Sequence, residues 1–317
     1  MRFSTLILQS CLLALCVCAC IREVELVVPG PPPRLVVNCL FTPDSSWSVE
    51  LSRGISLLDT HRQGPPVLDA EVLIYAADTQ LIVLRHTGEG RYESPLRPQV
   101  GQAYTLRVSA PGFPSVEARD SIPLLPELRQ PQLDTSTVLN LLDKVALLPF
   151  EVHPLDVLWK DPSKTADFYK IELIVFRTSF DAVSGQPLSE TTKGYLFTED
   201  PSAEKQFQDV DVGFVLLKDE RFKGQEKLLH AFTDKISSFA YCSPHSTELE
   251  LYLDFQSLSP ALYAYQLSVI QQLHAAGNPL TPHINVSSNV QGGLGIFGGY
   301  TVRRFLLFEG ELHGTCN

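Results

Sequence analysis

Short runs in which apolar and polar side chains alternate recur along the first third of the chain. Residues 46–52 read SWSVELS, so that Trp47, Val49 and Leu51 fall on one side of an extended backbone. This period of two is typical of a strand with one buried face. Turn residues separate such runs about every eight to twelve residues, as in a β-sandwich. We therefore predict a β-sandwich domain over residues 34–125, built from about seven strands.

Strand patterns resume after a Pro-rich stretch at residues 123–131. The strongest are residues 167–177 (DFYKIELIVFR) and 247–255 (TELELYLDF), which are rich in β-branched and aromatic side chains. We expect a second β-rich domain over residues 126–317. The predicted fold class is mainly β: a sandwich resembling immunoglobulin-like or carboxypeptidase-regulatory-like modules, followed by a second β-rich domain that carries one helix.

The single helix is predicted near residues 259–275. Ser259 can cap its start, and Pro260 occupies the first helical position, where the missing N–H of proline costs nothing. Helical spacing predicts an apolar stripe that packs in the core, formed by Leu262, Tyr265, Val269 and Leu273.

The start of the chain predicts export. Residues 6–19 are mostly apolar and follow Arg2, yet they fall short of the roughly 20 residues that span a bilayer. This pattern is typical of a secretory signal peptide. Val17-Cys18-Ala19-Cys20 resembles a bacterial lipobox, in which a small residue precedes the cysteine that is lipidated. We expect residues 1–19 to form a lipoprotein signal peptide and Cys20 to carry the lipid.

Other cysteines fit the lipobox less well. Cys16 and Cys18 follow Leu15 and Val17, where a small residue is required. The alternative is an ordinary signal peptide with chance cysteines. If Cys20 is acylated, several chains at about 0.8 kcal/mol per buried CH₂ anchor the protein firmly. The prolines in residues 20–33 then predict a stiff, extended tether.

Charge and cysteine content narrow the classes of partner. The formal net charge of −11 argues against binding nucleic acid or an anionic membrane surface through a broad basic face. An exported compartment permits disulfides, and Cys242 and Cys316 are candidates for one. Cys39 is expected to be a small buried strand residue.

Near the C-terminus, Gly293, Gly295 and Gly298 spell the G-x-G-x-x-G of dinucleotide-binding loops. That loop requires a helix after it, because the helix N-terminus binds the pyrophosphate. The residues that follow are β-branched and aromatic, which predicts a strand. The glycines are instead expected to serve a positive φ or a close approach to another segment.

No other motif predicts catalysis. The chain lacks H-E-x-x-H, G-x-S-x-G and Walker sequences, and Cys242-x-x-His245 alone lacks the paired clusters of a structural zinc site. We expect no enzyme activity, no catalytic residue, no cofactor and no metal. Aromatic residues that could stack on a glycan are Trp47, Trp159, Tyr195 and Tyr252, although both tryptophans are better interpreted as core.

Residues 289–300 (NVQGGLGIFGGY) resemble the C-terminal signature of the DUF4249 family, lipoproteins of Bacteroidetes without an assigned activity. Residues 34–37 (RLVV) resemble the first strand of that family. Residues 242–250, followed by 259–265, resemble its strand-then-helix segment. Members lie near outer-membrane TonB-dependent receptors, which implies a surface accessory to nutrient uptake.

The sequence and the resemblance together predict a lipid-anchored outer-membrane lipoprotein. Its expected role is that of a non-enzymatic accessory to a TonB-dependent transporter, with the receptor as partner. The alternatives are a stand-alone glycan- or peptide-binding surface module, a hydrolase with an unrecognised site, and a structural envelope protein.

Overall fold

The computed structural model describes residues 33–55, 64–76, 79–142, 149–180, 184, 186–204, 213–239, 247–276 and 284–312. Pro33–Asn317 forms one compact unit, separate from Met1–Pro32. Strands dominate the described residues, in which α2 (Pro260–Ala276) is the single α-helix. The prediction of a mainly β, sandwich-like fold with one helix is confirmed.

The first seven strands follow the predicted alternation. They are β1 (Leu35–Phe41), β2 (Trp47–Arg53), β3 (Glu71–Ala76), β4 (Thr79–Gly88), β5 (Arg91–Ser94), β6 (Ala103–Ser109) and β7 (Val116–Ser121). Antiparallel pairing gives the order β1-β2-β5-β4-β3-β6-β7. The ring of Trp47 on β2 lies 5.0 Å from that of Tyr104 on β6, although these strands are not neighbours in the sheet. The two ends of this run of strands therefore face each other across a core.

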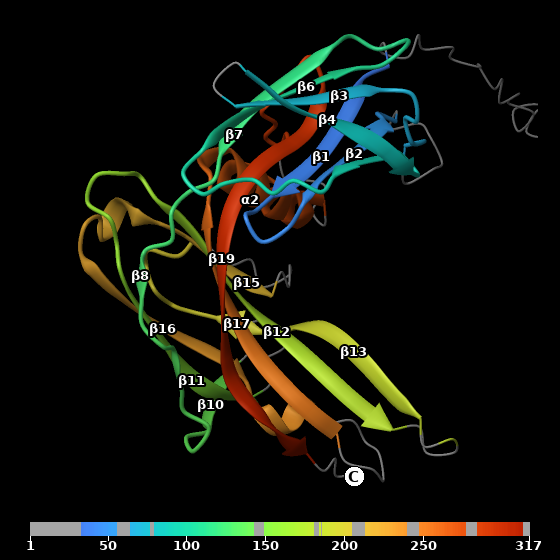
Figure 1. Ribbon diagram of the computed structural model, residues 1–317. Coiled ribbons are helices and arrows are strands. Elements are labelled where there is room, and N and C mark those ends of the chain that lie inside the picture. Colours follow the sequence, from blue (N-terminus) through green and yellow to red (C-terminus); the bar gives the residue numbers. More distant parts are fainter. Residues whose placement is uncertain are drawn as a thin grey trace, which may run out of the picture. The chain divides into compact units, whose positions relative to one another are not determined.

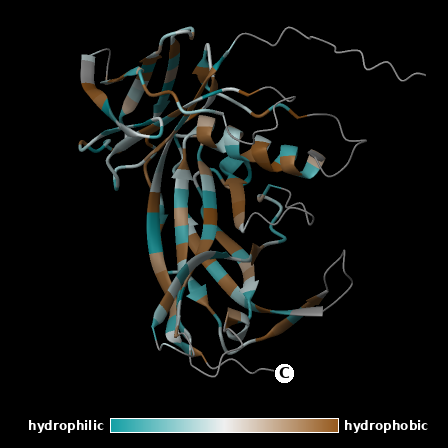
Figure 2. Cartoon of the chain, turned by 90° about the vertical axis from the view of Figure 1, so that its right-hand side faces the viewer, coloured by the Kyte–Doolittle hydropathy of each residue, from teal (hydrophilic) through white to brown (hydrophobic). Residues whose placement is uncertain are grey.

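A second core lies between two sheets in the following part of the chain. β11 (Pro149–Lys160) pairs with β16 (Glu226–Asp234) in a six-stranded sheet, while β12 (Phe168–Phe180) pairs with β17 (Thr247–Leu258) in the larger one. The Trp159 ring on β11 lies 5.5 Å from Tyr169 on β12 and 5.2 Å from Phe255 on β17. In Figure 2 the strands of both sheets carry alternating apolar and hydrophilic bands, as expected when one face is buried.

The remaining elements are further strands of the two sheets and two 3₁₀ turns. They are β8 (Glu127–Leu128), β9 (Gln132–Leu133), β10 (Leu139–Leu142), β13 (Pro187–Gly194), β14 (Leu196–Phe197), β15 (Phe214–Lys218), the 3₁₀ turns η1 (Asp219–Arg221) and η2 (Ile236–Phe239), and β18 (Val290–Gln291). β13 pairs antiparallel with the end of β12, and most of its side chains are exposed.

The last strand, β19 (Leu294–Leu312), belongs to both halves of the described fold (Figure 1). Its first six residues pair in parallel with β1, from Val36 opposite Leu294 to Phe41 opposite Gly299. From Tyr300 onward it pairs antiparallel with β17. Phe297 is buried in the first core and Phe305 in the second, so one strand contributes to both.

The glycines of β19 permit this close contact. Gly295 has a φ of 98°, and a Cβ added there would lie 2.0 Å from the carbonyl oxygen of Val37 on β1. A Cβ on Gly299 would lie 2.3 Å from the Ser121 carbonyl oxygen on β7. The expectation of a positive φ or a close approach is confirmed at Gly295, and Gly295 and Gly298 both lie within β19.

Asn289, which opens the same motif, fixes the entry of the chain into β19. Its side-chain amide donates to the Phe297 carbonyl at 2.7 Å, and its Oδ1 accepts from the Phe297 N–H at 3.0 Å. The amide thus replaces a backbone partner. Its nitrogen also donates to the carbonyl of Arg119 on β7 at 3.3 Å.

Helix α2 starts as predicted, since the Leu262 N–H donates to the Ser259 hydroxyl oxygen at 3.2 Å. Leu262 and Ile270 pack against Leu216 of β15 and Ile296 of β19. The expected core position of Leu273 is wrong, because that side chain is 55% exposed. The buried face of the helix includes Tyr263 instead, and the hydroxyl of that residue donates to Glu204.

Asp120 joins three elements at the end of β7. Its Oδ2 accepts hydrogen bonds from the hydroxyl of Ser259, which caps α2, and from the N–H of Gly299 on β19 at 3.0 Å. Burial raises the pKa of Asp120, while the hydrogen bonds oppose that rise. The division into domains at residue 125 stays a prediction, since the residues on either side share this junction and β19.

Replacing Gly295 with Ala should destabilise the protein far more than placing Ala at a glycine that has a positive φ but no close neighbour. Gly112 provides the control, because its φ is 80° and an added Cβ would meet nothing within 4 Å. Gly112→Ala should cost about 1–2 kcal/mol. Gly295→Ala should cost about 4 kcal/mol or prevent folding, because the Val37 carbonyl must also move. Urea unfolding of both variants measures the difference, and equal costs would refute the close contact.

Asp120→Ala should lower the free energy of unfolding by about 1–3 kcal/mol, because it leaves two donors without their acceptor. Asp120→Asn keeps an acceptor oxygen and should stay within about 1 kcal/mol of wild type at pH 7.

The pH dependence follows from the raised pKa of Asp120. Its contribution to stability is fully present below the unfolded value near 3.8 and is lost as pH rises through the folded value. Relative to Asp120→Asn, the wild type should therefore lose stability between about pH 3 and pH 7. Urea unfolding at both pH values tests this, and a parallel pH dependence of the two proteins would contradict it.

Candidate functional site

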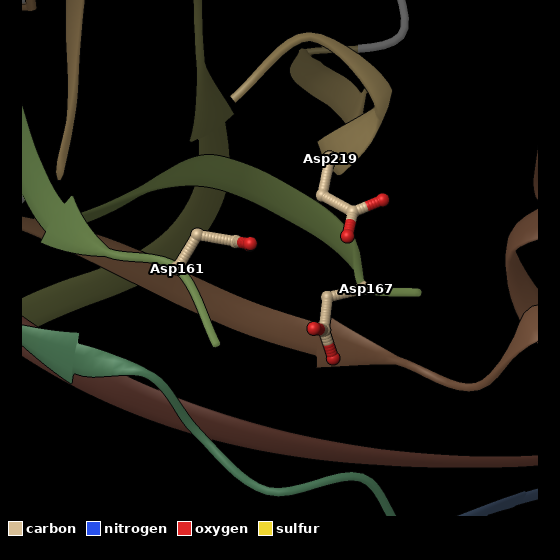
Figure 3. A group of neighbouring side chains, drawn as sticks. All are labelled: Asp161, Asp167 and Asp219. Atoms are coloured by element: carbon tan, nitrogen blue, oxygen red, sulfur yellow. The ribbon is translucent and has the colours of Figure 1, made fainter. Parts of the chain in front are cut away.

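Three aspartates from separate segments meet beside the second core. Asp161 follows β11, Asp167 precedes β12, and Asp219 opens the 3₁₀ turn after β15. One carboxylate oxygen from each lies within 4.8 Å of the others. In Figure 3 the three side chains lie close together; one Asp219 oxygen and the Asp161 carboxylate are directed toward the space between them, whereas the Asp167 carboxylate is directed away from Asp219 in this view.

Hydrogen bonds hold Asp161 in position. The Tyr169 hydroxyl donates to its Oδ1 at 2.5 Å, and the Gly224 N–H donates to its Oδ2 at 2.8 Å. Gly224 has a φ of 73°, and an added Cβ there would lie 2.8 Å from the Cβ of Ser163. A glycine is therefore needed for the 222–225 turn to approach this carboxylate.

Asp167 and Asp219 are linked through the backbone. The Asp219 N–H donates to the Asp167 carbonyl at 3.1 Å, and the Thr165 hydroxyl donates to Asp167 Oδ2 at 2.6 Å. Pairing of β15 with β12, from Phe168 opposite Lys218, places the two residues side by side.

The cluster is acidic and mostly removed from water. Asp161 and Asp219 are buried, whereas Asp167 is partly exposed. Burial raises the pKa of Asp161 and of Asp167, and the neighbouring carboxylates raise each further, while the hydrogen bonds to each carboxylate and the charge of Lys223 oppose the rise. Within the described part of the chain, these three aspartates are the residues best placed to hold a metal ion.

A second group of charges lies on the face of β12, β17 and β19 that points away from the second core. Glu172, whose side chain is 7% exposed, accepts from Lys170 and Lys193 at 2.8 Å each. Gln256 also donates to Glu172, at 2.6 Å. Burial would raise the pKa of Glu172, but the two lysines lower it overall.

Aromatic rings adjoin these charges. Arg304 binds Asp254 through two nitrogens at 2.7 Å each, and its guanidinium lies over the rings of Phe176 and Tyr252. The Arg304 side chain is 46% exposed. We call Phe176, Tyr252 and Arg304 the outer aromatic patch. It is a partly exposed surface on which a planar or sugar ligand could stack.

The residues predicted from sequence lie in different places. Trp47 and Trp159 are in the two cores, and Cys39 is buried, as expected. Of the remaining aromatic candidates, Tyr252 belongs to the outer aromatic patch and Tyr195 is partly buried elsewhere, before β14. Cys20, Cys242, His245 and Cys316 lie outside the described residues, so the lipid anchor and the disulfide stay predictions.

Sequence reasoning missed the aspartate cluster. Asp167 starts the predicted strand 167–177 and Asp161 lies six residues before it, which is a weak signal for paired carboxylates. Asp219 lies far along the chain and reaches them only through the pairing of β15 with β12. That pairing could not be read from local periodicity.

Comparison with known proteins gives one family. The family model described as "Domain of unknown function (DUF4249)" matches residues 21–305. No curated protein matches the chain. The match covers both cores, the aspartate cluster and the glycine-rich residues 289–300. The family resemblance found in the sequence rests on these glycine-rich residues. The chain belongs to the DUF4249 family.

Proposed function

We propose that this protein is a lipid-anchored outer-membrane lipoprotein that serves a TonB-dependent transporter as a non-enzymatic accessory in nutrient uptake. The observation that carries the proposal is the lipobox Val17-Cys18-Ala19-Cys20 at the end of a short apolar segment. Cys20 is the acylated residue in this proposal.

The spacing between the proposed anchor and the folded unit supports this role. The compact unit begins at Pro33, and residues 20–33 contain four prolines (Pro29, Pro31, Pro32 and Pro33). A Pro-rich segment extends by about 3.1 Å per residue, which holds a folded unit away from the bilayer surface. Anchoring also confines the protein to the plane of its partner and so raises the effective concentration of each for the other.

Within the described residues, no helix has the length and hydropathy to cross a bilayer. The proposal rests on the lipobox that ends at Cys20 and on the membership of the family.

A second candidate function is a surface module that binds a glycan or peptide without a transporter. The outer aromatic patch favours it, because Phe176 and Tyr252 meet edge to face with their ring centroids 5.5 Å apart, beside the partly exposed Arg304 guanidinium. In this alternative, Tyr252 would supply a stacking surface and Arg304 a hydrogen-bond donor.

Labelling with a fatty-acid analogue in the bacterium that makes the protein tests the anchor. Cys20→Ser should abolish the label and release the protein from the outer membrane, because the acylated sulfur is lost. Cys18→Ser is the matched control and should keep both label and location. Loss of label in Cys18→Ser alone, or in neither variant, would contradict the assignment of Cys20.

Co-purification after crosslinking tests the accessory role. A TonB-dependent receptor should be recovered with wild-type protein, and its recovery should fall sharply with Cys20→Ser. A glycan or peptide array probed with the Cys20→Ser protein separates the alternative. Ligand binding without any receptor, weakened by Tyr252→Ala, would favour the stand-alone module over the accessory.

A further inference from the structure

We propose that Asp161, Asp167 and Asp219 form a binding site for Ca²⁺. The proposal does not depend on the lipid anchor or on a transporter. It rests on the convergence of three carboxylates and on one buried oxygen that has no partner.

Asp219 supplies the observation that points to a ligand. The residue is 3% exposed, and its Oδ2 has no hydrogen-bond partner among the described residues. A buried carboxylate without a donor is strongly unfavourable, so such groups are normally paired with a cation or a metal ion. Among the ion pairs of the described residues, none involves Asp161, Asp167 or Asp219.

The other two carboxylates are already oriented. Asp161 is held by Tyr169 and Gly224, and Asp167 is held by Thr165. Each carboxylate oxygen has two lone pairs, so an oxygen that accepts one hydrogen bond can still bind a cation. Hydrogen bonds of this kind commonly orient the carboxylates that ligate a metal.

The donor set selects the class of ion. All three ligands are carboxylates, and the cluster contains neither histidine nor cysteine, which favours a hard cation over zinc or copper. Ca²⁺–O bonds of about 2.3–2.6 Å allow opposite ligands to lie up to about 5 Å apart, and Ca²⁺ accepts irregular geometry. Mg²⁺ requires a near-ideal octahedron at about 2.0–2.1 Å, which three unconnected segments satisfy less readily.

The position of the site indicates a structural role. Asp161 and Asp167 lie at the two ends of the connection from β11 to β12, which passes between the two sheets. Asp219 belongs to the turn after β15. A bound ion would join this connection to that turn, and the partly exposed Asp167 would give the ion its access from solvent.

Calorimetry and thermal unfolding of the full chain in detergent, after removal of metals with a chelator, test the site. Wild type should bind added Ca²⁺ with a dissociation constant of about 10⁻⁴–10⁻³ M, as extracellular calcium modules do, and its Tm should rise. Asp219→Asn should weaken binding at least about tenfold. Asp167→Asn, at a partly exposed position, provides a second variant in case the first folds poorly.

Glu220→Gln is the matched control. It removes the same charge from the next residue, whose side chain is 69% exposed and pairs with Lys218 at the surface. It should leave Ca²⁺ binding within about twofold of wild type. The proposal is overturned if wild type shows neither heat nor a Tm shift with millimolar CaCl₂, if Glu220→Gln loses as much affinity as Asp219→Asn, or if MgCl₂ binds more tightly than CaCl₂.

Discussion

The structure depends on the parallel contact between the first and last strands of the folded unit. Residues 294–299 pair with β1, and the same strand then continues along β17. At about 3.3 Å per residue, a strand of this length passes through two cores. The contact is possible because Gly295 has no side chain where the Val37 carbonyl of β1 approaches, and Gly299 likewise leaves room for the Ser121 carbonyl of β7. Asn289 and Asp120 satisfy the backbone groups that this arrangement leaves without strand partners.

Local patterns predicted the elements well. The strand at Trp47 and the helix that begins at Pro260 depend on alternation and on a cap, which neighbouring residues determine. Long-range pairing was not predictable, because the partner of β1 lies at the opposite end of the chain. The exposure of Leu273 has a similar origin: helical spacing identifies a stripe, whereas the neighbouring sheet determines which part of it is covered.

The two candidate sites also differ in how far the sequence alone could identify them. The proposed anchor at Cys20 is a short linear motif, so the sequence alone suggests it. The aspartate cluster requires β11, β12 and β15 to be correctly arranged, since Asp219 is remote in sequence from Asp161 and Asp167. If both proposals hold, one end of the protein provides attachment, while a cation stabilises the connection between the sheets that form the second core.

The central claim is that β19 makes the two cores one cooperative unit, and the two tryptophans allow a direct test. Trp47 reports on the first core and Trp159 on the second, and both are almost fully buried. Trp47→Phe and Trp159→Phe each leave a single fluorescent reporter. In each variant, the fluorescence of the remaining tryptophan and the far-UV circular dichroism of the whole chain should give the same midpoint and slope in urea, because unfolding of one core removes the strand on which the other depends. A fluorescence transition that separates from the circular dichroism transition in either variant would contradict the account.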